Sequence, residues 1–351
     1  MLSLAQDLSS GLPPEKEMMV QTEPDEPFWS ENILFALYDP VRDIGMWLHL
    51  GTVPNDWNLW EDRIYLTLPN GGGTLHMAAH HATAPELRPG ASAMHFRCVA
   101  PFRRWRVSFD GFAQHTSEAS MDAGDHVSYR RRLRIDLDIE CTTPVWDAHT
   151  AKGPPGVRGM DAQSWAKEHY EQLFRASGTM QLDSEVFPIE ATGWRDHSRG
   201  PRGGNTRDPW GGHVIVGCQF PSGRAIIFSQ YWRPDGVLNL TGGAVLEGNG
   251  GFHLCEVIEA PQLRTLELRG ERLPIRLRWE GGSLDTLLET TTSVWIPRER
   301  KHVVGRDRIG RLGDTYVLNW GPVRWGDETG YAYIERSAHL NALPDSVRPA
   351  A

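Results

Sequence analysis

Residues 127–141, with the sequence VSYRRRLRIDLDIEC, decide the fold class. With one arginine as the exception, the odd-numbered positions carry valine, tyrosine, leucine, isoleucine and cysteine. The even-numbered positions carry serine, arginine, aspartate and glutamate. Such an alternation with a period of two is typical of a β-strand that has one face buried and the other in water. The sequence therefore predicts a long strand in this segment.

The same alternation recurs along the chain, in RIYLTLP at 63–69 and in PIRLRWEG at 274–281. Clusters of turn-forming residues separate the strand-like runs, among them PNGGG, SFDG, RPDG and EGNGG. Many short strands with turns between them are typical of sandwiches and barrels. We therefore expect an all-β protein.

One segment has the pattern of a helix. Residues 161–178 read DAQSWAKEHYEQLFRASG, with an aspartate that could cap the first turn, apolar or aromatic side chains at near-helical spacing and a glycine at the end. A connector rich in proline and glycine, TAKGPPGVRG, precedes it. The expected organisation is an N-terminal extension (1–24), a β domain (25–150), a linker with one helix (151–178) and a second β domain (179–345).

Composition narrows the function. The chain has 351 residues, a formal net charge of −9, 40% apolar residues and 23% charged residues, which suits two globular domains and argues against a nucleic-acid partner. We find no run of 18 apolar residues that would predict an integral membrane helix and no pattern of a signal peptide. The four cysteines form no CxxC pair, so we expect reduced thiols in a cytoplasmic protein.

The sequence favours chemistry without a cofactor or metal. It contains no GxGxxG, no GxxxxGK[ST] and no GxSxG motif. His76 and His80 are four residues apart but lie in strand-like sequence, and the spacing of Asp196, His197, Asp208 and His213 specifies no ligand set. The 14 tryptophans often stand beside polar residues, so we expect some of them to line a cavity for an apolar ligand.

Residues 193–212, GWRDHSRGPRGGNTRDPWGG, hold the main candidate for catalysis. In an extended chain Trp194, Asp196 and Ser198 would share one face, so the sequence Asp-His-Ser cannot form a hydrolase triad by itself. In an apolar cavity, desolvation would raise the pKa of the aspartate and make it a proton donor near neutral pH. The alternative is an aspartate that is salt-bridged to a nearby arginine.

A resemblance to a known family adds to this interpretation. The order YEQLFRASGTMQLDSEVFPIEATGWRDHSRGPR, followed near the C-terminus by GDETGYAYIERS, resembles the carotenoid 1,2-hydratase and AttH-related family. That family has two lipocalin-like β-barrel domains and is related to the lipocalin-like Diels–Alderases. The resemblance spans roughly residues 25 to 340, and its sharp parts are the central GWRDHSxGxR and the terminal GYxYIE.

The resemblance implies a role for Asp196. In the carotenoid hydratases the aspartate of a related WDHNxG element protonates a terminal double bond, and Asp196 matches that position. Two neighbours depart from the pattern, since Arg195 replaces an aromatic residue and Ser198 replaces an asparagine. The family's architecture therefore transfers more safely than its substrate.

The expected function is that of a cofactor-independent lyase, of hydratase or dehydratase type, acting on a hydrophobic small molecule such as a terpenoid, steroid, polyketide or aromatic. The alternatives are a cyclase or isomerase in the same cavity, or a protein that binds a lipophilic ligand without reaction. Glu335 is either a second acid–base group or an ion-pair partner. The candidate catalytic residues are Asp196, His197 and Glu335, the candidate substrate-binding residues are Trp194, Ser198, Trp210, Tyr231, Trp232, Tyr331 and Tyr333, and the candidate structural residues are Arg195, Arg199 and Arg202.

Overall fold

The structure is a computed structural model. It describes residues 6–20, 22–54, 56–81, 93–123, 129–151, 157, 159–163, 165–202, 211–233, 235–248, 250–264, 267–297 and 315–338.

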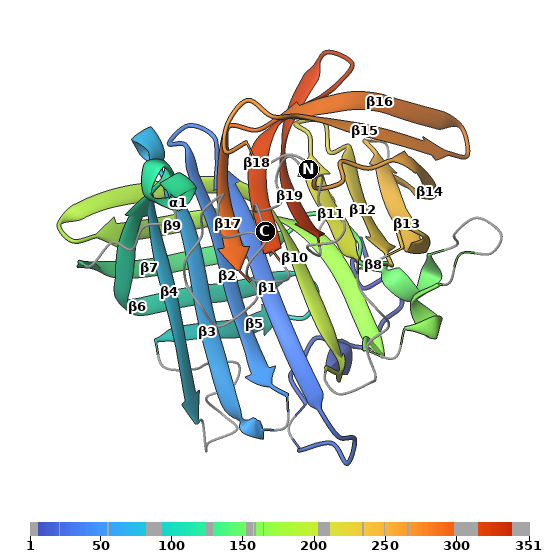
Figure 1. The fold of residues 1–351 in the computed structure, drawn as a ribbon. Coiled ribbons are helices and arrows are strands. Elements are labelled where there is room, and N and C mark those ends of the chain that lie inside the picture. The colour runs from blue at the N-terminus through green and yellow to red at the C-terminus, as the bar shows by residue number, and fades with distance from the viewer. Residues whose placement is uncertain are drawn as a thin grey trace.

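Two antiparallel sheets make up the fold, and each closes on itself as a barrel (Figure 1). In the first barrel the strands follow the order β10-β1-β2-β3-β4-β6-β7-β9, and β9 pairs with β10 to close the ring. Strands β5 and β8 pair with its members β6 and β9. The strands are β1 (Trp29–Asp39), β2 (Ile44–Val53), β3 (Asp56–Leu68), β4 (Gly72–His81), β5 (Met94–Ala100), β6 (Arg104–Ser117), β7 (Arg130–Cys141), β8 (Trp146–Asp147), β9 (Glu168–Leu182) and β10 (Glu185–Pro201).

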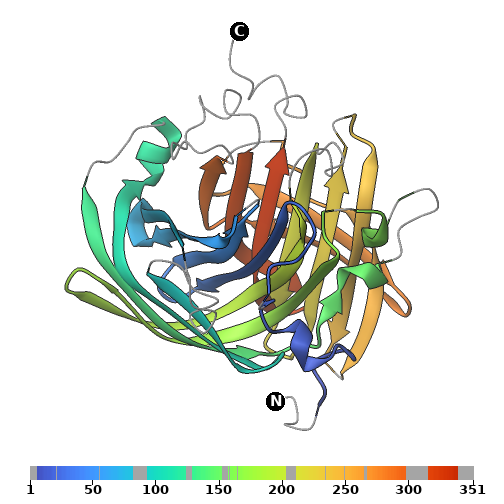
Figure 2. The same ribbon diagram turned by 90° about the horizontal axis from the view of Figure 1, so that it is seen from below.

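The second barrel follows the order β16-β15-β14-β13-β12-β11-β19-β18 and is closed by pairing of β16 with β18. Strand β17 pairs with β18. Figure 2 shows the two curved sheets side by side. The strands are β11 (Gly212–Gln219), β12 (Ala225–Trp232), β13 (Leu238–Glu247), β14 (Gly251–Glu259), β15 (Arg272–Trp279), β16 (Gly282–Glu289), β17 (Thr292–Pro297), β18 (Thr315–Trp325) and β19 (Glu328–Ala338).

The expectation of an all-β protein with two lipocalin-like barrels is confirmed. Strand β7 covers most of the segment that predicted it, and from Leu133 to Cys141 its residues alternate between buried and exposed. Helix is confined, in the described part of the chain, to α1 (Glu118–Ala123) and to 3₁₀ turns at Pro14–Lys16, Pro69–Gly71, Ala148–Thr150 and Met160–Ala162. None of the described helices is long and apolar enough to span a bilayer.

The helix expected at 161–178 is wrong. Most of that segment belongs to β9, which pairs with β7 on one side and with β10 on the other. Residues 169–174 are all buried, because one face of β9 contacts the interior of the first barrel and the other contacts the second barrel. A strand buried on both faces loses its alternating pattern, and this run then resembles a helix.

The chain passes from one barrel to the other later than the sequence pattern indicated. Strand β10 pairs with β1 and β9, so residues 185–201 belong to the first barrel. The second barrel begins with β11 at Gly212. The change therefore falls between 201 and 212, whereas the pattern placed it at 178/179.

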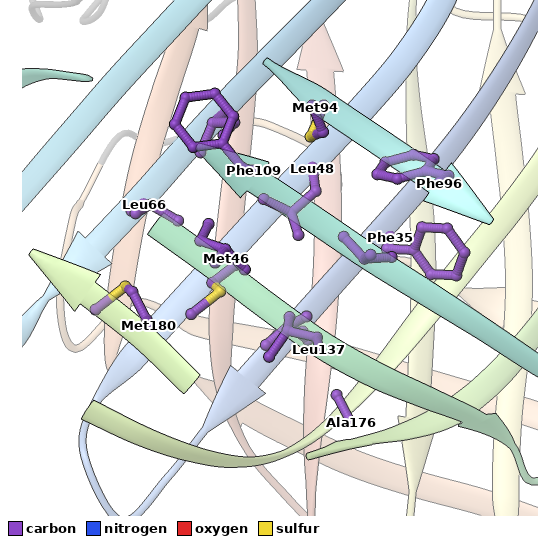
Figure 3. Close-up of a cluster of buried hydrophobic side chains, with 14 of the residues drawn as sticks. Phe35, Met46, Leu48, Leu66, Met94, Phe96, Phe109, Leu137, Ala176 and Met180 are labelled. Carbon is purple, nitrogen blue, oxygen red and sulfur yellow. The ribbon is translucent and has the colours of Figure 1, made fainter. Parts of the chain in front are cut away.

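Three large apolar clusters, and a small one formed by Phe102, Val145 and Tyr170, fill the described part of the molecule. One lies inside the first barrel, where Phe35, Met46 and Met180 pack together (Figure 3). A second, which includes Val216 and Ile275, fills the second barrel. The third, which we call the junction, collects the outward-facing side chains of β1, β9 and β10 and those of β11, β12, β18 and β19. The residues with the candidate chemistry lie at this junction.

Candidate active site

Strand β10 separates two chemical environments. Its residues alternate, so Arg195, His197 and Arg199 point away from the face that carries Asp196. Arg195 is fully buried and forms an ion pair with Glu17, with 2.7 Å between Nη1 and Oε1. Its Nε and Nη2 groups also donate hydrogen bonds to the side-chain oxygen of Gln172.

His197 lies in the same buried network and not beside Asp196. Its Nδ1 is 2.7 Å from the hydroxyl oxygen of Tyr170, and its Nε2 is 2.7 Å from Oε1 of Glu31. The candidate catalytic residue His197 therefore does not contact Asp196, because alternation turns the two side chains to opposite faces of β10. Arg199 completes the network through ion pairs with Glu31 at 3.1 Å and with Glu168 at 2.6 Å.

Asp196 has a different environment. Its side chain is 14% exposed and faces the junction, directly opposite Glu171 on β9 and Leu34 on β1. Within the part of the chain that the structure describes, the one basic side chain in ion-pair range of Asp196 is His169, whose Nε2 lies 4.0 Å from Oδ2. Burial raises the pKa of Asp196 to about 7, and the carboxylate of Glu171 acts in the same direction. Such a carboxyl is protonated for much of the time near neutral pH.

Glu171 organises the side chains beside Asp196. It is fully buried, and its Oε2 accepts a hydrogen bond of 2.8 Å from Nε1 of Trp194. Its Oε1 lies 3.2 Å from Nε2 of His169. The glutamate therefore orients both the histidine and the tryptophan that flank Asp196.

The second barrel contributes a second carboxylate, Glu335 on β19. Its Oε1 is 2.9 Å from Nε2 of His213, and its Oε2 accepts hydrogen bonds from the Tyr333 hydroxyl at 2.5 Å and from Nε1 of Trp47 at 3.4 Å. Burial raises the pKa of Glu335, but these hydrogen bonds outweigh burial and lower it overall. Glu335 is therefore held as a carboxylate.

Aromatic rings surround these groups at the junction. Trp194 stacks on Tyr333 with 5.4 Å between ring centroids, and Tyr231 stacks on His213 at 5.3 Å and contacts Trp165 at 5.6 Å. The barrels approach closely here, since a Cβ added to Gly217 would lie 2.6 Å from Cδ1 of Trp194. The site is thus an aromatic region with a few placed polar groups.

The remaining candidates are distributed unevenly. Ser198 faces the junction and accepts a hydrogen bond from Nη2 of Arg202, whose guanidinium lies over the ring of Trp165. Tyr331 packs against the junction cluster, but Trp232 packs against the core of the second barrel. Trp210 lies outside the described residues.

Metal ligation has no support in the described part of the chain, which holds no group of three or more His, Cys, Asp or Glu side chains placed to bind an ion. His76 contacts Asp62 and the carbonyl of Phe112. The side chain of His80 and all of Asp208 lie outside the described residues, and His213 contacts Glu335.

Sequence reasoning missed four members of the site: Trp47, His169, Glu171 and His213 as a partner of Glu335. The signal for two of them was present, because in a strand His169 and Glu171 are two apart and share a face. Their assignment to a helix concealed it. Trp47 comes from β2, far from β10 in sequence, and nothing local indicated that pairing.

The comparisons with known proteins agree with the fold. A family model described as "Domain of unknown function (DUF7064)" matches residues 13–282. No curated protein matches the chain. An AttH-like protein from Nitrosomonas europaea is similar in structure, with a TM-score of 0.53 and 13% identity, covering 89% of this chain and 92% of that chain.

Two further solved structures are similar. CghA, crystallised with Sch210972, has a TM-score of 0.51 and 9% identity, covering 90% of this chain and 89% of its own. Kievitone hydratase from Nectria haematococca has a TM-score of 0.48 and 13% identity, covering 88% of each chain. At these identities the likeness to the AttH-like protein and to CghA establishes a shared architecture and nothing more.

Proposed function

We propose that this chain, which belongs to the DUF7064 family, is a cofactor-independent hydro-lyase that adds water to, or removes it from, a hydrophobic small molecule. Asp196 is the proton donor. The reaction takes place at the junction of the barrels, among the rings of Trp194, Tyr333 and Trp47. Because these surroundings are apolar, the substrate is a lipophilic molecule, and the reaction requires that it carry an alkene or an alcohol.

The observation that carries the proposal is the contrast between two carboxyl groups at one site. Burial raises the pKa of Asp196 to about 7, whereas the hydrogen bonds to Glu335 lower the pKa of that group. Environments that separate the pKa values of neighbouring carboxyl groups assign one to the acid role and the other to the charged role. Asp196 is then the acid, and Glu335 is the fixed negative charge.

The chemistry uses both groups. Asp196 gives its proton to an alkene carbon, and the π electrons form the new C–H bond, leaving a cation on the neighbouring carbon. Aromatic faces such as those of Trp194 and Tyr333 attract a cation, and the carboxylate of Glu335 adds to this attraction. Water then adds to the cation and loses one proton to give the alcohol, and Asp196 regains a proton from solvent.

The direct test is oxygen labelling. The purified protein is incubated in H₂¹⁸O with any ligand that co-purifies with it and with a panel of lipophilic alkenes that includes linalool, squalene and kievitone, and the products are analysed by mass spectrometry. A product heavier by one labelled water supports the proposal. An unlabelled isomer would instead establish a cyclase or isomerase, and an unchanged retained ligand would establish a carrier.

The variant Asp196→Asn tests whether incorporation of labelled oxygen depends on Asp196. Asparagine keeps the size of the side chain but has no carboxylic proton, so labelling should fall by about 10²–10⁴-fold, while binding of the ligand persists. Asp136→Asn is the control, because Asp136 is 58% exposed and pairs with Arg106 on the outer face of the first barrel. Full labelling by Asp196→Asn would remove Asp196 from the mechanism.

A further inference from the structure

A histidine outside the groups described so far lies on the same sheet face as Asp196, two strands away. His49 on β2 is directly opposite Leu34 on β1, and Leu34 is directly opposite Asp196 on β10. Directly opposite residues of adjacent strands point to the same face, so His49 and Asp196 share the junction face with one strand between them. Two strand spacings place their Cα atoms about 10 Å apart.

The hydrogen bonds of the neighbouring side chains fix the tautomer of His49. The hydroxyl of Ser30 donates to the carbonyl of Thr52, and its oxygen accepts from Nδ2 of Asn32 at 3.0 Å. The other end of that amide, Oδ1 of Asn32, therefore faces Nε2 of His49 at 3.1 Å. Since an amide oxygen only accepts, Nε2 carries the hydrogen and Nδ1 has a free lone pair.

The ring of His49 is also held in place. It stacks on Trp47 with 5.2 Å between centroids and 8° between planes. Gly51 leaves the room that Asn32 needs, since a Cβ there would lie 2.3 Å from Oδ1 of Asn32. No described group makes a hydrogen bond to Nδ1 of His49.

Two other bases of the site, Glu335 and His213, already have hydrogen-bond partners. Glu335 accepts three hydrogen bonds, and both ring nitrogens of His213 have partners, Glu335 and Ser337. His169 faces Asp196 through the same nitrogen that binds Glu171, and its Nδ1 has no hydrogen-bond partner among the described residues. His169 lies on β9, on one side of Asp196, whereas His49 lies on the other side, beyond β1, and supplies a second imidazole lone pair there.

We propose that His49 is the general base of the site and that its Nδ1 accepts a proton from the water that adds to the substrate. The inference rests on the hydration chemistry proposed above. Asp196 loses its proton to the alkene carbon, the water oxygen bonds to the cation, and His49 takes one proton from that oxygen to leave an alcohol. Asp196 then regains a proton and His49 releases one, both through solvent, and dehydration runs the same steps in reverse.

Burial, together with Arg63 and Arg202, lowers the pKa of His49 well below its usual value, which keeps the imidazole neutral and able to accept. The charged and titratable groups around it are Arg63 and Glu61 on β3, Asp196 on β10, Arg202 after β10, and Glu335 on β19, which is reached through Trp47. These groups enter any pH profile of the site.

The first test needs no substrate. Nitrogen-15 NMR of the imidazole side chains, assigned with His49→Gln, should show His49 neutral and protonated on Nε2 from pH 5.5 to 8. A proton on Nδ1, or an imidazolium at pH 7, would overturn the assignment as base, whatever the protein does.

The second test uses the labelling reaction with the most reactive alkene of the panel. His49→Gln keeps a donor to Asn32 and should lower kcat by about 10²-fold or more, with KM changed little. Asn32→Asp should move the acidic limb of the pH profile of kcat to higher pH, because a carboxylate makes the imidazole more basic. A merely structural histidine would not produce that shift.

If Asp196→Asn abolishes labelling while His49→Gln stays within about threefold of wild type, the assignment of His49 as the base is wrong and the proposed function stands. If the wild type labels no alkene of the panel, both proposals fail.

Discussion

The two faces of β10 carry ionisable side chains in contrasting environments. On one face Arg195, His197 and Arg199 are buried, and each has an acidic partner within 3.1 Å. On the other face Asp196 has a partial exposure of 14%, and the nearest basic atom in the described chain, Nε2 of His169, is 4.0 Å away. One face of the strand therefore holds charges that are paired, and the other holds a carboxyl without a close ion-pair partner.

Stability and reactivity are therefore located on opposite faces of the same strand. A buried ion pair with complete hydrogen bonds fixes the strand, and removing one partner leaves a buried charge. A carboxyl without donors is instead a burden to the folded state and is typical of sites that transfer protons. Substitutions on the two faces should therefore change the free energy of unfolding in opposite directions.

The largest expected effect is on the paired face. Glu17→Gln removes the partner of the fully buried Arg195, and the free energy of unfolding should fall by about 3–5 kcal/mol. Urea denaturation followed by fluorescence measures it. Glu15→Gln is the control, because Glu15 is exposed in the same segment and should change stability by less than about 0.5 kcal/mol. Equal effects of the two substitutions on the free energy of unfolding would show that the ion pair between Glu17 and Arg195 contributes no stability.

The opposite sign is expected for Asp196→Asn. Because the folded state raises the pKa of this carboxyl from 3.8 to about 7, the native protein loses stability as pH rises through that window. Asparagine removes the loss, so the variant should be more stable than wild type above pH 7, by about 4 kcal/mol at most. The gain should shrink by about 2–3 kcal/mol on lowering the pH to 5. A variant less stable than wild type at pH 8 would show that Asp196 is part of an ion pair.

The smallest expected effect concerns the contact between the barrels at the site. Gly217→Ala places a Cβ 2.6 Å from Trp194 and should lower the free energy of unfolding by about 1–3 kcal/mol through overpacking. Near-ultraviolet circular dichroism should report the displaced indole. Gly159→Ala, where an added Cβ has its nearest neighbour at 3.8 Å, is the matched control and should leave both measurements unchanged.

The fold class could be predicted from the sequence because strands with one wet face retain the alternating pattern, as β7 does. The pattern fails where a strand is buried on both faces. In β9 the residues from His169 to Phe174 are all buried although Glu171 and Gln172 are polar, so no alternation marks the strand and the spacing of its aromatic residues predicted a helix. The same error moved the expected domain boundary into β9, since a helix cannot be the strand that closes a barrel.

The candidate site was predicted in part for the same reason. Alternation along β10 correctly grouped Trp194, Asp196 and Ser198 on one face. The partners of the arginines, Glu17, Glu31 and Glu168, could not be found, because they are brought to β10 by pairing between distant segments. Sequence order holds no direct record of such contacts. His49, which reaches the site through β1, is a further example.

The pairing of β10 with β1 also sets the order in which the protein can be assembled during translation. The first barrel closes when β1 pairs with β10, for example Trp29 with Pro201. This pairing cannot form until nearly all of the chain between the two strands has been synthesised. At about 5–20 residues per second, β10 leaves the ribosome about 10–30 s after β1. Through that interval β1, with the apolar run ILFALY at 33–38, has an unpaired edge of the kind that aggregates. The nascent chain is therefore expected to need a chaperone until residue 201 has emerged, and the acidic group of the site comes into register only with that last strand.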